Sequence, residues 1–189
     1  MQTAGERIVQ TLIRLDPLAN LPRTGFLMRG IRPCESIADH SFGVALCVML
    51  LVDAARAQGL EVDGERALRM ALVHDAPEAA LGDVPSPVKS PELDEALTAV
   101  ERTLVERLVP PPAPELWDEL EAAETLEARI VRVADKLQMM VKVLIYERQG
   151  RRGLDAFWEN PKNQRDYDLG FAAEAFARVR ELRTADRGG

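Results

Sequence analysis

The only two histidines of the chain both fall on apolar faces of predicted helices. At 100° per residue, His40 lies on the stripe of Val44 and Leu51. His74 lies on the stripe of Met70 and Glu78 in a later segment. Burying a polar group without a partner costs free energy, so a fold that buries both imidazoles must also supply groups that bind them. The sequence therefore requires helices that pack with ionisable groups in contact.

Apolar residues recur at helical spacing in the long segments, and no segment alternates convincingly in the manner of a strand. Stretches rich in Pro and Gly separate these segments. Pro77 lies inside one of them and should kink or restart its helix just after His74 and Asp75. We therefore predict an all-α fold, a single compact bundle of about six to eight helices. The expected helices span about 6–15, 37–58, 63–81, 91–108, 115–122, a longer one that ends near 149, and 168–183.

The composition fits one soluble globular domain. Of the 189 residues, 47% are hydrophobic and 29% are charged, which is enough for a sizeable core. The net charge of −7 disfavours a nucleic-acid polymer as a partner. The longest apolar run, Val44 to Val52, is too short to span a membrane, so no membrane contact is expected. Cys34 and Cys47 form no CxxC pattern and the first residues lack a signal-peptide pattern, which together predict a reduced, cytoplasmic protein.

Asp135 is a third ionisable residue on an apolar helical stripe, close to Val131 and Met139. Taken alone, a histidine on such a stripe is usually a satisfied core residue, and an aspartate is usually a salt-bridge partner. Together they favour a different interpretation, because one divalent cation shared by two imidazoles and two carboxylates removes the cost of burial for all of them. Mixed nitrogen and oxygen donors suit Mn²⁺, Co²⁺, Fe²⁺, Ni²⁺ or Zn²⁺.

Other catalytic signatures are not found in the sequence. Residues 74–78 read His-Asp-Ala-Pro-Glu and not the His-Glu-x-x-His of zincins. The sequence also has no Walker A loop, no Gly-rich dinucleotide fingerprint and no Gly-x-Ser-x-Gly elbow.

The ordered set of His40, His74-Asp75 and Asp135 resembles the HD-domain metal phosphohydrolases. The resemblance covers about residues 8–150 of a single HD domain that we expect to span 1–189, with 151–185 as a C-terminal helical extension. Four flanking segments look like the 5′-deoxynucleotidase group within that family: Glu35–Ser41, His74–Glu78, Gly82–Lys89 and Ala134–Leu137.

The resemblance implies roles for several side chains. Glu78 would handle the attacking water as general base. Asp83 is the second catalytic candidate, and it would also lie at the nucleotide and contact its sugar. Arg23 would bind the phosphate, and Lys89 is a second candidate for that role. Phe26 would pack near the base. The metal ligands would be His40, His74, Asp75 and Asp135.

Each of these assignments has a simpler structural alternative. Glu78 could be a helix-end glutamate paired with an arginine, and Asp83 a turn residue. Arg23 and Lys89 could be solvated surface charges, and Phe26 could be a core residue.

The predicted function is metal-dependent removal of the 5′-phosphate from (deoxy)ribonucleoside monophosphates, with one divalent metal ion as cofactor. One alternative is an HD phosphohydrolase that acts on a deoxynucleoside triphosphate, an alarmone or a cyclic dinucleotide. Another is a non-catalytic helical dimer stabilised by its metal. A small-molecule nucleotide is the expected substrate. A homodimer is also expected, with apolar residues near Phe157 and Trp158 as a suitable interface.

Overall fold

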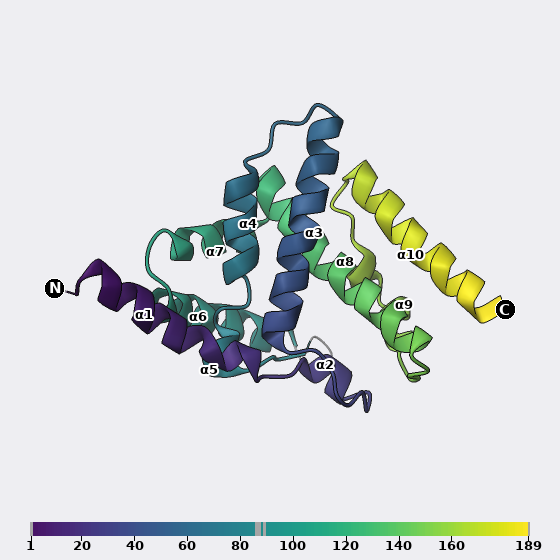
Figure 1. The fold of residues 1–189 in the computed structure, drawn as a ribbon, viewed down its shortest axis with the longest axis horizontal. Coiled ribbons are helices and arrows are strands. Elements are labelled where there is room, and N and C mark those ends of the chain that lie inside the picture. Colours follow the sequence, from purple (N-terminus) through teal and green to yellow (C-terminus); the bar gives the residue numbers. More distant parts are fainter. Residues whose placement is uncertain (1, 86–87, 89, 189) are drawn as a thin grey trace.

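Figure 1 shows a computed structural model of the chain, which describes residues 2–85, 88 and 90–188. Helices dominate the described residues, and the only strand-like pairing among them is an isolated bridge between Pro22 and Ser36. The all-α prediction is confirmed.

Three helices form the centre of the molecule: α3 (Ile37–Ala57), α4 (Gly64–Val73) and α8 (Leu126–Arg148). They pack against one another pairwise, and α3 crosses in front of α8 in Figure 1. The Ser36 hydroxyl accepts a hydrogen bond from the amide of Asp39 and begins α3 with a capping box. Fully buried aliphatic side chains fill the space between the three helices, among them Val44, Val48, Met70, Ile130, Val133, Met140 and Val143.

The helix predicted for 63–81 is interrupted in the structure. Helix α4 ends at Val73, and a short helix, α5 (Glu78–Leu81), begins after Pro77. Proline lacks an amide hydrogen and cannot continue the hydrogen-bond ladder of α4, but its fixed φ suits the start of a new helix. Glu78 therefore does not share a continuous helical face with His74, contrary to the wheel projection.

A smaller core lies beside the central helices. It joins α6 (Pro91–Leu108) and α7 (Ala113–Ala122) through buried Val105 and Trp117. Helix α1 (Ala4–Leu15) lies on the same side of the molecule as α6. The two helices are joined by a hydrogen bond of 2.7 Å, which the Arg14 guanidinium donates to the carbonyl oxygen of Arg107.

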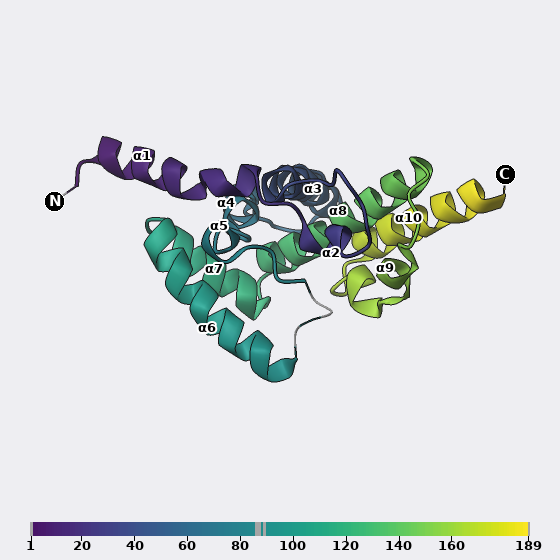
Figure 2. The same ribbon diagram turned by 90° about the horizontal axis from the view of Figure 1, so that it is seen from below.

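The stretch expected to be irregular between the first two long helices contains two short helices. These are η1 (Asp16–Ala19) and α2 (Thr24–Leu27). Helix α2 lies next to the end of α3 at which α3 begins (Figure 1 and Figure 2). This connection brings Arg23 back toward the centre of the bundle.

The C-terminal part packs against α8. Helix α9 (Asp155–Glu159), η3 (Pro161–Gln164) and α10 (Gly170–Gly188) all follow it in the chain. Phe157 and Trp158 are partly buried against the main core, and the interface expected near them stays a prediction.

Helix α3 is apolar around its whole circumference. By length and composition alone, α3 is apolar enough to cross a membrane, with a mean hydropathy of 1.6 over its most apolar window. The expectation of no membrane contact rests only on the uninterrupted apolar run from Val44 to Val52, which is shorter than this helix. The core helix of a soluble protein passes the same test. One face of α3 is buried in the core, whereas Phe42, Leu46, Met49 and Leu50 are exposed on the other.

Candidate metal centre and active site

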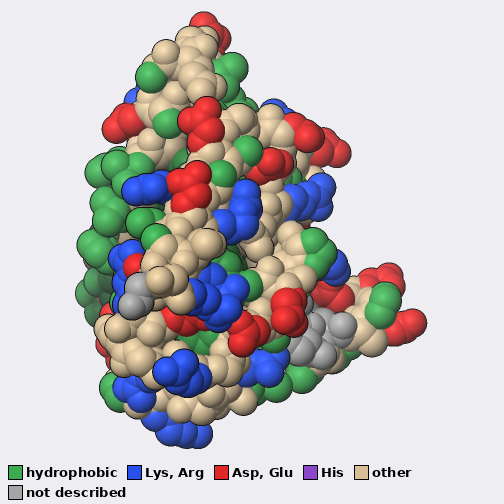
Figure 3. Space-filling model, turned by 90° about the vertical axis from the view of Figure 1, so that its right-hand side faces the viewer, with side chains coloured by type: hydrophobic (Ala, Val, Ile, Leu, Met, Phe, Trp, Pro, Cys, Tyr) green, Lys and Arg blue, Asp and Glu red, His purple; other side chains and the backbone are tan. Residues whose placement is uncertain are grey.

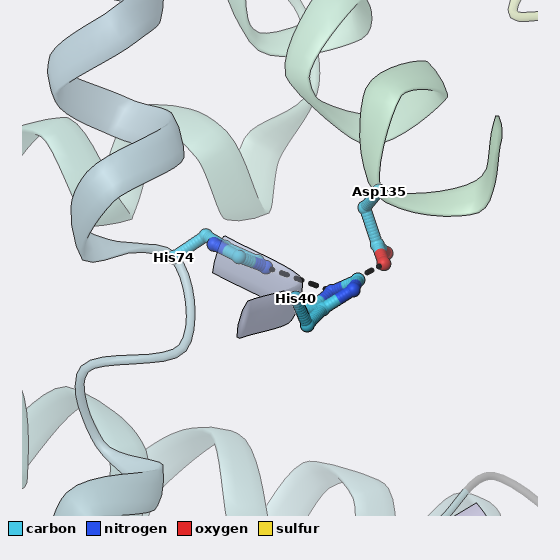
Figure 4. Close-up of side chains that lie close together, drawn as sticks. All are labelled: His40, His74 and Asp135. Carbon is cyan, nitrogen blue, oxygen red and sulfur yellow. Dashed lines mark hydrogen bonds and ion pairs between the residues drawn. The ribbon is translucent and has the colours of Figure 1, made fainter. Parts of the chain in front are cut away.

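Three separate segments bring ionisable side chains together near the start of α3. His40 follows the Ser36 cap by one turn, and its side chain is completely buried. His74 lies at the end of α4, directly before Asp75, and Asp135 lies in the middle of α8. Figure 4 shows His40, His74 and Asp135 converging from these segments.

The donor atoms of these side chains are spaced as the ligands of one metal ion would be. Nε2 of His40 lies 3.4 Å from Nε2 of His74 and 3.3 Å from Oδ1 of Asp135. Oδ2 of Asp75 lies 3.0 Å from Nε2 of His74 and 3.7 Å from Nε2 of His40. Bonds of about 2.0–2.2 Å to a metal place its ligands about 3–4 Å apart. His40, His74 and Asp135 therefore form a group that could hold one divalent cation, and Asp75 lies against both histidines of that group.

The two imidazoles turn lone pairs, and not hydrogen-bond donors, toward each other. Nδ1 of His74 lies 2.8 Å from the carbonyl oxygen of Ala71, and Nδ1 of His40 lies 2.6 Å from the amide oxygen of Gln138. Because both oxygens only accept hydrogen bonds, each neutral ring carries its hydrogen on Nδ1. Both Nε2 atoms then face each other and the carboxylates of Asp75 and Asp135, an arrangement that a bound cation, or a proton shared with a carboxylate, makes favourable.

Electrostatics at this point also suit a cation. Burial would raise the pKa of Asp75, but His74 and Arg23 outweigh burial and hold that pKa well below its usual range. Burial is likewise outweighed at Asp135, where Lys136 contributes most to lowering the pKa. For His74, burial would lower the pKa, but Asp75 and Asp135 outweigh it and the pKa is raised. A metal would displace the proton from His74, so metal binding should weaken as pH falls.

Glu78 is a buried carboxyl group beside this cluster. Burial raises its pKa to about 10, with further contributions from the negative charges of Asp75 and Asp83. Within the described residues, its Oε2 has no hydrogen-bond partner. A carboxyl group in this state can donate or accept a proton at the site, and a nearby cation would lower its pKa.

Arg23 is held against the cluster by carboxylates. Its Nη1 lies 3.4 Å from Oδ2 of Asp75 and 3.9 Å from Oδ1 of Asp83. Asp83 also accepts a hydrogen bond from the amide of Thr24 at 2.5 Å. Burial would lower the pKa of Arg23, but these carboxylates outweigh it and raise the pKa, so the guanidinium stays charged. The structure therefore places Asp83 as the group that holds the Arg23–Thr24 segment.

A cavity of about 870 Å³ opens over the cluster. This volume lies within the range of small-molecule sites. Its wall includes Arg23, Asp75, Glu78, Asp83 and Asp135, which brings together most of the residues predicted for the site.

Two predicted substrate contacts, Phe26 and Lys89, are not among the wall residues just named. Phe26 lines the cavity, but its ring is only 2% exposed and packs against Tyr146 and Phe157, each with a centroid distance of 5.1 Å. Phe26 therefore belongs to the core as much as to the cavity wall. Lys89 lies outside the described residues.

Sequence reasoning missed the C-terminal contribution to the cavity. Phe157, Asn160, Lys162, Arg165 and Tyr167 line it, although they lie beyond the part of the chain that carried the family resemblance. No local motif marks these residues, because they reach the cavity only through the packing of α9 and η3 against α8.

Comparison with known proteins agrees with this geometry. Residues 15–175 match the family model described as HD domain. The chain is 35% identical to the 5′-deoxynucleotidase hdd1 of Schizosaccharomyces pombe, over 79% of this chain and 78% of that protein. It is 30% identical to the human 5′-deoxynucleotidase HDDC2, over 74% of this chain and 68% of that protein.

A solved structure extends the likeness to almost the whole chain. The crystal structure of the PH0347 protein from Pyrococcus horikoshii superposes with a TM-score of 0.77 at 34% identity, covering 93% of this chain and 98% of that chain. The chain therefore belongs to the HD-domain family of metal-dependent phosphohydrolases, in the group that contains the curated 5′-deoxynucleotidases.

Proposed function

We propose that this protein removes the 5′-phosphate from deoxyribonucleoside or ribonucleoside monophosphates and releases nucleoside and phosphate. The observation that carries the proposal is that Glu78 and Arg23 line one cavity with His74, Asp75 and Asp135. His40 lies behind this wall, with its Nε2 in reach of His74, Asp75 and Asp135. The names of the relatives point to the same reaction.

His40, His74, Asp75 and Asp135 would hold one divalent metal ion, and their nitrogen and oxygen donors suit Mn²⁺, Co²⁺, Zn²⁺, Ni²⁺ or Fe²⁺. When bound, such an ion lowers the pKa of water and polarises a phosphate oxygen.

The remaining chemistry is assigned to side chains of the cavity. Arg23 binds the phosphoryl group with charge-assisted hydrogen bonds, and Asp83 keeps the Arg23–Thr24 segment in place. Glu78 takes the proton of the attacking water as the water oxygen bonds to phosphorus. The bond between phosphorus and the 5′ oxygen breaks on the opposite side, and that oxygen takes a proton from solvent and leaves as the nucleoside hydroxyl. Phe26 and the aromatic side chains of the C-terminal segment offer apolar surface for the base.

Two alanine variants test the proposal. Asp75→Ala should abolish phosphate release and lose the metal, whereas Glu78→Ala should abolish phosphate release with the metal retained. Metal content and phosphate release are measured on a panel of ribo- and deoxyribonucleoside monophosphates with added Mn²⁺ or Co²⁺. Full activity of Asp75→Ala would overturn the scheme.

The same assay separates the competing functions. Release of pyrophosphate or triphosphate from a deoxynucleoside triphosphate or an alarmone, or cleavage of a cyclic dinucleotide, would assign the site to another nucleotide. Absence of turnover on every nucleotide in the presence of bound metal would favour a structural role for the ion.

We also propose a homodimer that forms through one apolar face of the molecule. This outer face consists of exposed side chains of α1 and α3: Ile8, Val9, Leu12, Ile13, Phe42, Leu46, Met49 and Leu50. Both helices lie along the same edge of the molecule in Figure 2. A column of hydrophobic side chains also runs along the left edge of Figure 3, the side that faces the viewer in Figure 1.

Two properties of these helices support a second copy as the occupant of the outer face. Helix α1 buries none of its 12 residues in the chain itself, and a helix of this length is marginal without packing. Helix α3 is apolar on all sides, which is typical of a helix that is covered on all sides. Pairing of the outer face with the same face of another copy gives a closed symmetric dimer and covers both helices.

A single HD domain over residues 1–189 and a cytoplasmic location complete the proposal. One core cluster that includes residues from Phe26 to Val179 supports the first. Two free cysteines, Cys34 and Cys47, support the second because free thiols are usual in reducing compartments.

A further inference from the structure

The imidazole of His40 is contacted on the side that faces away from the metal cluster. Its Nδ1 lies 2.6 Å from Oε1 of Gln138 on α8. Gln138 follows Asp135 by three residues, so one face of α8 supplies both a carboxylate of the cluster and a group behind the imidazole. Neither the sequence motifs nor the proposed chemistry gives Gln138 a role.

The second partner of Gln138 determines how its amide is oriented. Nε2 of Gln138 lies 3.1 Å from Oε2 of Glu35. An ionised carboxylate only accepts hydrogen bonds, so the amide NH₂ must face Glu35 and the amide oxygen must face His40. That oxygen also only accepts, so Nδ1 of His40 carries the hydrogen and Nε2 presents its lone pair to the cluster.

Glu35 is held through one carboxylate oxygen, Oε2, and through its backbone, while its Oε1 has no hydrogen-bond partner within the described residues. Its side chain is 1% exposed, and Nζ of Lys142 lies 3.4 Å from the same Oε2. Its backbone amide donates to the Tyr146 hydroxyl at 2.8 Å. A buried carboxylate needs such partners, and removing them would leave a costly unpaired charge. Lys142, Glu35, Gln138 and His40 thus form one connected chain of polar contacts.

Gly43 provides the space in which Gln138 lies. A Cβ atom at Gly43 would be 2.8 Å from Cγ of Gln138, a distance that real Cβ atoms essentially never show, and 3.0 Å from Nε2, which is also tight. Gly43 lies in the middle of α3, where glycine costs about 1 kcal/mol relative to alanine. Room for the Gln138 side chain gives a physical reason for a glycine at this position.

We propose that Gln138 is a positioning residue that holds His40 in the Nδ1–H form, with Glu35 setting the amide orientation and Gly43 providing the space. The inference rests on the metal-dependent function proposed above, because it concerns how one ligand is prepared for the ion. Partners behind a ligating histidine commonly change metal affinity by about 10- to 100-fold.

The first test is Zn²⁺ affinity, measured by competition with a chromophoric chelator. Gln138→Leu should weaken binding about 10- to 100-fold. Gly43→Ala should also weaken it, although alanine is the better helix former, because the new methyl group displaces Gln138. Gly170→Ala is the matched control, since a Cβ there meets nothing within 4 Å, and its affinity should equal that of the wild type.

An exchange of the two side chains separates positioning from packing. Gln138→Glu alone places two carboxylates side by side, and Glu35→Gln alone leaves the amide orientation unset, so each should weaken Zn²⁺ binding. The double variant Gln138→Glu/Glu35→Gln again pairs an amide with a carboxylate and again offers His40 an acceptor. Its affinity should recover toward the wild-type value, which a purely packing role would not predict.

The tautomer can also be observed directly, because the chain has only two histidines. Long-range ¹⁵N–¹H spectra of the zinc-loaded protein should show His40 with hydrogen on Nδ1, and Gln138→Leu should change the His40 signals but not those of His74. Coordination of His40 through Nδ1, or unchanged affinity and spectra in both Gln138→Leu and Gly43→Ala, would overturn the inference alone. A wild-type protein that binds no metal would overturn the proposed function and this inference with it.

Discussion

At the scale of single residues, the site is a set of buried charges. Each would cost free energy to bury alone, and its neighbours offset that cost. Lowered pKa values keep Asp75 and Asp135 ionised, whereas the raised pKa of Glu78, three residues after Asp75 in the chain, keeps that carboxyl group protonated. The difference follows from the neighbours, since Arg23 and the imidazoles face Asp75, whereas other carboxylates contribute to raising the pKa of Glu78. Divergent pKa values among neighbouring acids are typical of catalytic sites.

The raised pKa of Glu78 predicts a pH-dependent stability of the metal-free protein. The folded-state pKa of about 10 exceeds the unfolded value of about 4.3. Between these values the unfolded chain loses the proton and the folded chain keeps it, so rising pH favours unfolding. Glutamine cannot ionise, so Glu78→Gln should be more stable than the wild type above about pH 4.3, by about 1.4 kcal/mol for each further pH unit up to the folded-state pKa, with the gain lost below about pH 4. Urea denaturation with chelator across pH measures this, and a pH-independent difference would contradict it.

Arg23 should dominate phosphate binding among the arginines of the cavity. Arg23→Ala removes charge-assisted hydrogen bonds worth about 2–3 kcal/mol, so kcat/KM should fall about 30- to 150-fold. Arg29 lines the same cavity but is exposed, and Arg29→Ala should change kcat/KM little. Steady-state kinetics on a nucleoside monophosphate compares the two variants, and equal losses would argue against a special role for Arg23.

At the scale of elements, the ends of α3, α4 and α5 supply several groups of the site, whereas Asp135 comes from the middle of α8. His40 lies in the first turns of α3, and His74 lies at the last turn of α4. Pro77 ends the local helical ladder, so Glu78 starts a new helix that borders the cavity. The sequence predicted the interruption at Pro77 but placed Glu78 on the face of His74, because a helical wheel assumes an unbroken helix.

Loss of the cap of α3 should affect both stability and the metal. Ser36→Ala removes the hydrogen bond from the Asp39 amide, 3.0 Å long, and should cost about 1 kcal/mol of unfolding free energy. Ser90→Ala removes the corresponding cap of α6 and should cost a similar amount. Only Ser36→Ala should weaken metal binding, because only α3 carries a ligand in its first turns. Denaturation and metal titration of both variants would show this, and equal metal affinity in the two would refute it.

At the scale of the whole molecule, the two apolar faces of α3 differ in their exposure to solvent. The inner face of α3 joins the core, and its outer face remains exposed together with α1. Burial of an exposed leucine or phenylalanine contributes about 1.5–3 kcal/mol, so the outer face is a large source of association free energy.

The outer face should control the oligomeric state. The wild type should sediment at twice the chain mass of 21.0 kDa, and Leu46→Glu should shift it to the monomer. Val100→Glu on α6 is a matched control, because Val100 is 47% exposed, as Leu46 is at 46%, but lies away from the outer face. Sedimentation equilibrium decides the matter, and a monomeric wild type at high concentration would exclude the homodimer.

The sequence by itself determined the long helices and indicated that His40, His74, Asp75 and Asp135 would lie together. Helical periodicity and caps are local properties, and an ionisable residue on an apolar stripe must meet partners wherever that stripe is buried. Only the tertiary structure decided that Gln138 lies behind His40, that Asp83 binds the Thr24 amide, and that the C-terminal segment closes one side of the cavity. These contacts join residues 59 to 98 positions apart in the chain or depend on how α9 and η3 pack on α8, and no local pattern encodes them.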